Sequence, residues 1–523
     1  MNNHNLVPSA SVAVVPAPSA PDSPDAPGRA GGAWLYLGTL VLALGLTACA
    51  NMSGIAPQAQ LRDGGSLGLP SAATGTPDFF ADIAVPEQWW RSFGDSRLDG
   101  LVDQAIAGSP SLKAAEARIA RAEAATETVR AADGPQLNGS LDATRQRFSA
   151  RGIYPAPLGG STRNIGTARL TGSWEIDFFG KNRAALEAAV GASNAAQADA
   201  QAARLLLASN VTRGWFQLAR LQAQLEVAER TLAQRQETLT LVRDRVTAGL
   251  DTRLEQRQSE GGLPEARQQI EALQEQIALT RNAIAALVGQ PQIADTLQAP
   301  SIAAIRPVTL PDALPADLLG RRADVAAARW RVEAAAGEVG VAKTQFYPNV
   351  SLTAFVGLNA IGFDRLVNGN SGEWGVGPAI RLPIFDSGRL RANLRSRTAD
   401  LDAAVESYNS SLIDAVHDCA DQIASARAIV RQQQEQRDAQ AAAESAYEIA
   451  LQRYRAGLGT YLNVLTAENA VLAQRRLAVE LAGRRLENQV ALIRALGGGF
   501  GTPAVQPTTS ATLPPATTTA ALR

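Results

Sequence analysis

The chain has 523 residues, which is long enough for two or more ordinary domains or for one elongated architecture. Its formal net charge of −1 gives no reason to expect a nucleic-acid partner, and two cysteines with two histidines cannot build a disulfide framework or an ordinary zinc site. The sequence also lacks a phosphate-binding glycine-rich loop with lysine and a G-x-S-x-G motif. We therefore predict no enzymatic activity, no catalytic or metal-binding residues and no dissociable cofactor.

The N-terminus has the features of a targeting segment over residues 1–48. A polar lead rich in Pro, Ser and Ala is followed by Arg29 and by an apolar stretch over residues 33–46. The next letters, "LTAC", resemble a bacterial lipobox, which implies that Cys49 is acylated with diglyceride and palmitate and becomes the mature N-terminus. The alternative is a plain secretory signal with an incidental cysteine. Residues 49–86 are then expected to form a lipid-anchored extended segment.

The first half of the chain, residues 87–288, predicts three helices and two strands. Between residues 180 and 248 there is no proline, and apolar residues recur in a heptad seam that only Arg235 interrupts. At about 1.5 Å per residue this helix would be roughly 100 Å long, and the two shorter helices placed end to end would match it. The predicted elements are helices 98–132, 181–248 and 252–288, and strands at about 136–147 and 165–178.

The second half, residues 315–497, repeats the first. The segment "RVTAGLDTRLEQRQSE" from Arg245 matches "RYRAGLGTYLNVLTAE" from Arg453, and a glycine in each marks a turn between two helices. The predicted elements are helices 315–345, 388–455 and 461–496, strands at about 349–360 and 373–385, an extended crossover over 289–314 and a disordered tail over 498–523.

The second and fourth strands alternate apolar or small residues with polar ones, and the first and third do so less cleanly. This pattern is typical of a sheet with one apolar and one polar face. Such a sheet usually covers a soluble core, but here the flanking helices are long rods that leave little to cover the apolar face. After residue 50 no window reaches the roughly 18 to 20 apolar residues of a transmembrane helix, so any crossing there must use strands. Four strands leave two open sheet edges, so the chain must oligomerise if these strands span the membrane. Two copies give a filled eight-stranded barrel, whereas three give twelve strands and room for a lumen.

Five segments carry a resemblance to a known family over residues 87–497. They are "WWRSFGDSRLDGLVDQAIAGSPSLKAAEARI", "LPADLLGRRADVAAARWRV" with Ala323 where a proline is common, "FYPNVSLTA", "LPIFDSGRLRA" and "RYRAGLGTYLNVLTAENAVLAQ". In order, and with the duplication, they resemble the outer membrane factor family of TolC-like and OprM-like channels. The similarity is greatest to its NodT-type lipoprotein branch, which serves resistance-nodulation-division (RND) efflux pumps.

The resemblance implies a mainly helical fold with a membrane β-barrel. In it a homotrimer combines a twelve-stranded outer-membrane barrel with a periplasmic α-barrel of long antiparallel helical hairpins. It implies an outer-membrane location in a Gram-negative bacterium, with the helical part in the periplasm. It implies partners in outer-membrane lipid, a periplasmic adaptor and an inner-membrane RND pump. The implied function is passive conduction of drugs or other small toxic solutes to the exterior.

Motif matching with the family also assigns residues to a periplasmic gate. Leu462 and Thr466 match a constricting ring, and Tyr454 matches a position that latches neighbouring helices. Because family members often place a carboxylate where this chain has Thr466, a ring of Leu462 that gates by dewetting is the physical account we expect. The alternatives are ordinary packing of Leu462 in a helix seam and of Tyr454 in a core.

The two turns between helices are the expected contact for the adaptor. A solvated, charged helix end is the alternative interpretation. The residues concerned are Arg245, Gly249, Arg253, Arg453, Arg455 and Gly457.

Two other functions stay open from the sequence. One is an exit duct for type I protein secretion. The other is a lipid-anchored periplasmic coiled-coil scaffold whose strands stay out of the bilayer.

Overall fold

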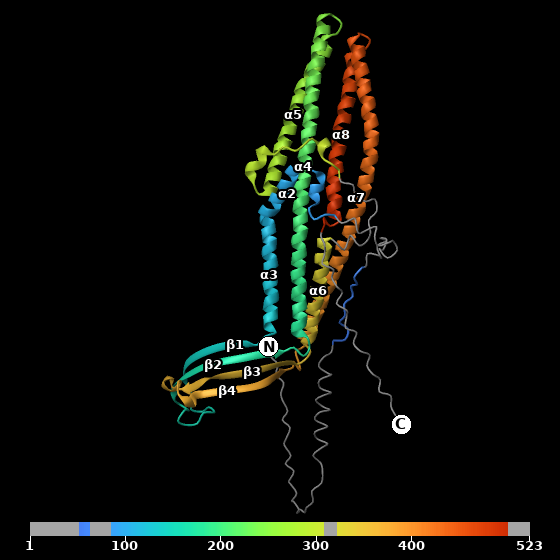
Figure 1. Cartoon of the computed structure of the whole chain (residues 1–523). Coiled ribbons are helices and arrows are strands. Elements are labelled where there is room, and N and C mark those ends of the chain that lie inside the picture. Colours follow the sequence, from blue (N-terminus) through green and yellow to red (C-terminus); the bar gives the residue numbers. More distant parts are fainter. Residues whose placement is uncertain (1–51, 63–84, 308–321, 500–523) are drawn as a thin grey trace, which may run out of the picture. The chain divides into compact units, whose positions relative to one another are not determined.

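A computed structural model describes residues 52–62, 85–307 and 322–499. Several expectations therefore lie outside the described residues: the signal segment 1–48, Cys49, much of the segment 49–86, the start of the helix expected from 315, and the tail from 500 onward. Within the described parts, long helices connect to one four-stranded sheet (Figure 1). No helix there combines the length and the apolar composition that a membrane crossing requires.

The first half is organised around one very long helix. Helix α4 (Lys181–Thr247) has 67 residues, which corresponds to about 100 Å. Helix α3 (Pro110–Ala132) packs along the part of α4 nearest the sheet, and α5 (Arg253–Val288) packs along the part that ends at the turn (Figure 1). The two short helices thus lie along successive parts of the long one, as the length arithmetic predicts.

The single helix expected over 98–132 is wrong, because the structure has two. Helix α2 (Ser96–Gly108) ends at Ser109, whose φ of −64° and ψ of 121° are extended, and α3 begins at Pro110. The ring of a proline disfavours helical backbone in the residue before it, while its fixed φ suits the first position of a new helix. The Ser109 hydroxyl accepts a hydrogen bond from the Leu112 amide at 3.4 Å, so Ser109 also caps the second helix.

The second half repeats the arrangement. Helix α7 (Arg389–Arg455) again has 67 residues, with α8 (Tyr461–Ala495) and α6 (Ala323–Thr344) packed along it. The α4–α5 and α7–α8 turns contain Gly249 and Gly457, with φ of 73° and 76°, a backbone conformation that favours glycine. The turns therefore lie where the sequence repeat predicts them.

The crossover between the halves is not uniformly extended, in contrast to the prediction for 289–314. Its described part contains two short 3-10 helices, η4 (Pro291–Thr296) and η5 (Ile302–Ala304). Pro291 supplies the fixed φ that starts the first of them. Leu297 and Ile305 are buried against the core, so apolar burial folds this segment back on the helices.

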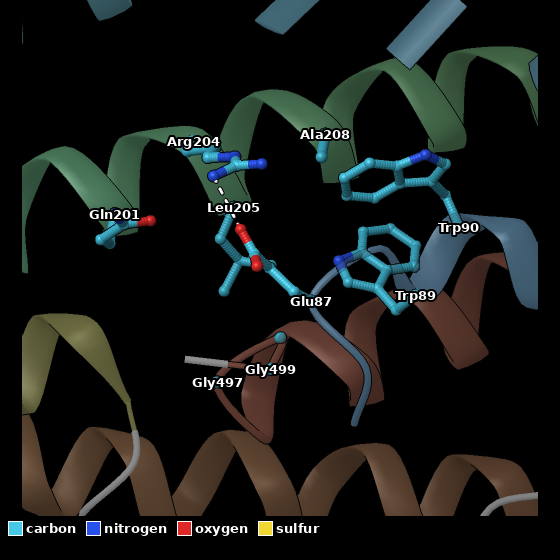
Figure 2. A pocket seen from close by; sticks show the side chains of 10 residues that line it. Glu87, Trp89, Trp90, Gln201, Arg204, Leu205, Ala208, Gly497 and Gly499 are labelled. Atoms are coloured by element: carbon cyan, nitrogen blue, oxygen red, sulfur yellow. Dashed lines mark ion pairs between the residues drawn. The ribbon is translucent and has the colours of Figure 1, made fainter. Parts of the chain in front are cut away.

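The core lies at the middle of α4, where the short helix η3 (Trp89–Phe93) packs against it. Figure 2 shows Trp89 and Trp90 beside α4, and the Glu87 carboxylate paired with the Arg204 guanidinium at 2.8 Å. The two indoles line a cavity of about 230 Å³ together with the glycines that follow α8. The three aromatic residues of the segment "WWRSF" are therefore buried in the core.

The four strands form one antiparallel sheet in the order β1-β2-β3-β4. Their bounds are β1 Gln136–Arg147, β2 Thr162–Ile176, β3 Asn349–Ile361 and β4 Gly372–Arg381. Strand β4 ends four residues before the predicted position, because Pro383 cannot donate to a ladder and the Asp386 carboxylate already caps α7. Leu382 and Ile384, which the alternation placed on the strand, lie in this connection instead.

Candidate functional site: the two-faced sheet and the helix turns

The register of the sheet separates its side chains into two faces. Because residues directly opposite each other point to the same side, the pairs Leu170 with Val356 and Val356 with Trp374 share a face. The larger apolar side chains of this face are Leu137, Leu141, Leu170, Trp174, Ile176, Val350, Leu352, Val356, Leu358, Trp374, Val376 and Ile380. Many are exposed in the protomer, with Trp374 at 78 % and Leu137 at 73 %. The predicted alternation of polar and apolar residues is therefore present over most of the sheet, although Arg145 and Arg147 take the apolar-face positions at the end of β1.

The opposite face is polar and contains a built charge pair. Arg169 of β2 donates from Nε to Oε1 of Glu373 on β4 at 3.0 Å, reaching across β3 at Gly357. The Arg169 guanidinium also lies over the Phe355 ring, 4.7 Å from its centroid. A Cβ at Gly375 would come within 2.6 Å of that ring, so glycine leaves the space in which Phe355 lies flat.

Three side chains join the ends of the two helical hairpins. Tyr454, near the end of α7, is 0 % exposed and donates its hydroxyl to Asp251 in the α4–α5 turn. Arg245 donates from Nε to Oδ2 of Asp251 at 2.9 Å and from Nη1 to the Tyr454 carbonyl at 3.0 Å. Its guanidinium lies 4.6 Å from the centroid of the Tyr454 ring. We call Arg245, Asp251 and Tyr454 the latch.

The latch perturbs the pKa values of its members in opposite directions. Burial disfavours the charged Asp251 carboxylate, but hydrogen bonds from Arg245 and Tyr454 outweigh burial and hold the pKa of Asp251 below its usual value. Burial and the neighbouring Asp251 carboxylate raise the pKa of the Tyr454 phenol. The phenol therefore stays protonated and donates to an ionised carboxylate, which is a strong form of hydrogen bond.

Leu462 and Thr466 lie on one exposed face at the start of α8. Leu462 is 61 % exposed in the protomer, so it is not packed in an internal seam there. Thr466 is also exposed, and its hydroxyl donates to the Leu462 carbonyl at 2.8 Å. The other side of the same helix turns buries Tyr461 and Val464. Tyr454, by contrast, is buried in a core and also donates a hydrogen bond to Asp251. Core packing and a contact between helices are therefore not alternatives for this side chain.

The arginines at the turns differ in their surroundings. Arg245 has a side chain only 12 % exposed and acts within the protomer, whereas Arg253, Arg453 and Arg455 are exposed. Gly249 and Gly457 are exposed at the two turns as well. Sequence reasoning missed three leucines beside these arginines: Leu250, Leu254 and Leu458 are 65 %, 63 % and 69 % exposed. The repeated letters "AGL" in both turns were the available signal for two of them.

Residues 52–62 lie along α7 and are held by its polar side chains. Asn409 accepts from the Arg62 amide and donates to the Gln60 carbonyl, both at 2.9 Å, and is only 3 % exposed. Asp402 accepts from the amides of Gln58 and Ala59 at 2.9 and 3.0 Å. Nearer the sheet, Arg391 donates to the Ser53 carbonyl at 3.1 Å. We call residues 52–62 the strap; nothing in the sequence pattern pointed to its position.

Comparison with known proteins agrees with this geometry. The family model described as outer membrane efflux protein matches residues 101–290 and 314–498, most of the chain. The chain belongs to the outer membrane efflux protein family. Members of this family are transport channels rather than enzymes, as the sequence predicted. The expected fold class is likewise confirmed as mainly helical, TolC-like and with four antiparallel strands.

Individual relatives are named for resistance and export. The chain is 37 % identical over 370 residues to the fusaric acid resistance protein FusA of Burkholderia cepacia, covering 70 % of this chain and 69 % of the relative. It is 31 % identical over 460 residues to the putative multidrug resistance outer membrane protein MdtQ of Escherichia coli, covering 86 % and 96 %. It is also 31 % identical over 473 residues to the pyoverdine export outer membrane protein OpmQ of Pseudomonas putida, covering 89 % and 97 %.

Solved structures show the same fold. The outer membrane protein VceC from Vibrio cholerae superimposes with a TM-score of 0.76 at 38 % identity, covering 79 % of this chain and 99 % of that one. The outer-membrane channel OprN gives a TM-score of 0.75 at 27 % identity, covering 86 % and 97 %. MdtQ, OpmQ, VceC and OprN are thus named as outer membrane proteins or channels, and this protein is an efflux channel of that class.

Proposed function

We propose that this protein is the trimeric exit duct of a tripartite efflux system, conducting small toxic solutes from an inner-membrane RND pump and a periplasmic adaptor to the exterior. The observation that carries the proposal is the uncovered apolar face of the sheet opposite a charged polar face. On β2 the apolar or small residues run from Ile176 to Gly166, ten residue steps. At about 3.3 Å per step and a tilt near 40°, they span roughly 25 Å, the height of the apolar band of outer-membrane barrels.

The free edges of the sheet support a trimer. Among the described residues, strands β1 and β4 each pair on one side only, and unpaired edges are not tolerated in hydrocarbon. Because the sheet is antiparallel, β4 of one copy can pair with β1 of the next. Three copies then give twelve strands with the Arg169–Glu373 face toward a water-filled lumen, whereas two copies leave little room inside.

The gate in this proposal lies at the start of α8. Three copies of the exposed Leu462, with Thr466 one turn further, would form an apolar constriction that excludes water. The latch would hold the hairpins in the closed arrangement, since Tyr454 and Asp251 belong to different halves of the chain. Opening would separate them.

The strap supports the lipid anchor on Cys49. Cys49 precedes Ser53 by four residues, and four residues of chain reach at most about 14 Å. Ser53 is bound to Arg391, the third residue of α7, just after the connection from β4. An acyl chain on Cys49 would therefore enter the membrane close to the sheet that spans it.

The turns fit an adaptor partner. The exposed leucines leave apolar surface beside Arg253, Arg453 and Arg455, and arginine is enriched in protein interfaces. Relatives named for resistance to drugs or fusaric acid and for pyoverdine export support small solutes as cargo. The class of solute would be set by the pump.

The proposal is tested by fractionation followed by reconstitution. The protein should remain in the outer membrane after alkaline extraction, migrate as a heat-sensitive trimer and form ion-conducting pores in planar bilayers. Mass spectrometry of the mature chain should show a lipid on Cys49. Release by alkaline extraction, with no pores, would instead support the periplasmic scaffold. Deletion strains should gain susceptibility to small drugs, whereas loss of a secreted protein would support the type I secretion duct.

A further inference from the structure

Arg235 is the one residue that interrupts the apolar seam of α4, and its side chain is 12 % exposed. It lies twelve residues before the end of α4, about 18 Å from the α4–α5 turn. Arginine at a packed helix position loses apolar contacts and must find polar partners. Each of its partners lies on another helix.

The first partner is a buried carboxylate on α8. Arg235 Nε donates to Oε1 of Glu468 at 3.2 Å, and the Glu468 side chain is only 5 % exposed. Glu468 follows Leu462 by six residues on the same helix, about 9 Å along its axis. The contact therefore joins α4 to the segment of α8 that carries the proposed gate.

The other partners lie on α5. Arg235 Nη1 donates to the Gly262 carbonyl at 2.8 Å and pairs with Oε2 of Glu265, an exposed side chain, at 3.1 Å. A Cβ at Gly262 would lie 3.4 Å from Nη1, so glycine leaves room for the guanidinium against the helix. Pro264 has no N–H to donate to the Glu260 carbonyl, so with Gly261 and Gly262 α5 carries three unfavourable helix residues at this point.

We propose that Arg235 is a positioning residue for the gate. It fixes the start of α8 against α4 and α5, and thereby sets the closed position of Leu462. This inference rests on the proposed function, because it assigns a role in gating. Arginine specifies position here because its fork must meet a carboxylate on α8 and a carbonyl on α5 together, whereas an apolar residue would tolerate sliding of the helices.

A pair of variants separates positioning from stability. Arg235→Leu leaves the Glu468 carboxylate buried without its cation, so the trimer should melt at a lower temperature. The double variant Arg235→Leu with Glu468→Leu completes the apolar seam and should recover the melting temperature. If Arg235 positions the gate, the double variant should still shift the open–closed equilibrium in planar bilayers toward open by about tenfold.

Two matched controls use residues of α5. Glu271→Leu removes an exposed carboxylate about 9 Å further along α5 than Glu265 and should leave conductance unchanged. Gly262→Leu fills the space that the Arg235 guanidinium occupies beside α5 and should raise conductance. Gly261→Leu makes the same change on the adjacent residue, where an added Cβ meets nothing within 4 Å, and should not.

The outcomes distinguish this inference from the proposed function. Return of both melting temperature and conductance to wild-type values in the double variant would overturn the positioning role, as would equal effects of Gly261→Leu and Gly262→Leu. Wild-type protein that forms no pores would overturn the proposed function, and the inference with it. Pores that respond to Asp251→Asn but not to the double variant would overturn the inference alone.

Discussion

The Tyr454 hydroxyl donates to the Asp251 carboxylate and so links the end of α7 to the turn between α4 and α5. The two residues are 203 positions apart and come from different halves of the duplicated chain. Arg245 completes the contact by binding both of them. A small change in this cluster should therefore alter the relation between the two hairpins without disturbing either hairpin by itself.

Tyr454→Phe and Asp251→Asn should each favour the open channel. Loss of a hydrogen bond to a charged group costs about 1.5–3 kcal/mol, which corresponds to a shift of the open–closed equilibrium by about tenfold or more. Mean conductance in planar bilayers measures the shift. Tyr408→Phe, on the same helix far from the turn, serves as the control. Unchanged conductance in both latch variants would contradict the role of the latch.

Acid should open the channel through Asp251. The pKa of Asp251 in the latched protein is below its usual value of 3.8, so protons bind more tightly to an unlatched state in which the pKa is ordinary. The latch is fully formed at pH values above the ordinary pKa of an aspartate. It is lost as the pH falls through the lowered pKa that Asp251 has in the latched protein. Conductance should therefore rise as pH is reduced below about 4, and Asp251→Asn should abolish this rise.

Glu468 should act in the opposite direction. Burial raises the pKa of its carboxyl, and Glu265 raises it further, although Arg235 lowers it. Burial, with a smaller contribution from the Glu468 carboxylate, also raises the pKa values of Tyr447 of α7 and Tyr461 of α8. The buried Glu468 carboxyl thus binds a proton more tightly than an exposed one would. Acid therefore favours the state in which Glu468 is packed between α4, α5 and α8. An acid-driven opening that survives in Asp251→Asn would contradict both assignments.

Leu462→Ser should increase leak through the closed channel. A hydroxyl in place of an exposed apolar side chain removes the surface that excludes water from the constriction. Susceptibility of cells to large antibiotics and conductance in planar bilayers both report the leak. Leu458→Ser makes the same change at the turn and should leave conductance in the isolated channel unchanged, although it should weaken the adaptor contact. Equal leak from the two variants would argue against a ring at Leu462.

Much of this molecule could be predicted because its signals are local. The heptads of α4, the paired glycines of the turns and the period of two in β2 each depend on a few neighbouring residues. The break at Ser109 could have been predicted too, because it follows from Pro110 alone. The pairing of Tyr454 with Asp251 and of Arg235 with Glu468 could not be predicted from local patterns, because these partners lie 203 and 233 positions apart in sequence.

The strap shows a different limit. Asn409 and Asp402 resemble ordinary exposed helix residues in the sequence, yet they bind backbone groups of residues 58–62. A short polar segment has no hydrophobic period of its own, so no pattern predicts which helix it contacts. Its position depends on hydrogen bonds to specific side chains, which only the folded chain brings together.

Asn409→Ala should loosen the strap. The variant loses two hydrogen bonds to backbone groups, each contributing about 1 kcal/mol. The expected results are faster proteolysis within residues 52–62 and a lower melting temperature of the trimer, with single-channel conductance unchanged. Asp414→Ala, an exposed position on the same helix, is the control. Equal proteolysis of both variants would contradict the contact.

Val376→Arg and Gly377→Arg test the two faces of the sheet with one substitution at adjacent positions. Val376 lies on the apolar face and is 64 % exposed, while Gly377 lies on the polar face, where an added Cβ meets nothing within 4 Å. Near the middle of a spanning strand, arginine facing lipid costs roughly 2–4 kcal/mol, whereas arginine facing water does not. Val376→Arg should therefore reduce the yield of heat-sensitive trimer in the outer membrane.

Gly377→Arg should insert normally and alter ion selectivity instead, because it adds a positive charge to the proposed lumen. Reversal potentials in a salt gradient measure that change. A periplasmic scaffold with a water-exposed sheet would respond differently, since Val376→Arg would then remove an apolar side chain from a wet surface and improve solubility. Normal trimer yield from Val376→Arg would therefore favour the scaffold over the channel, whatever the effect of Gly377→Arg.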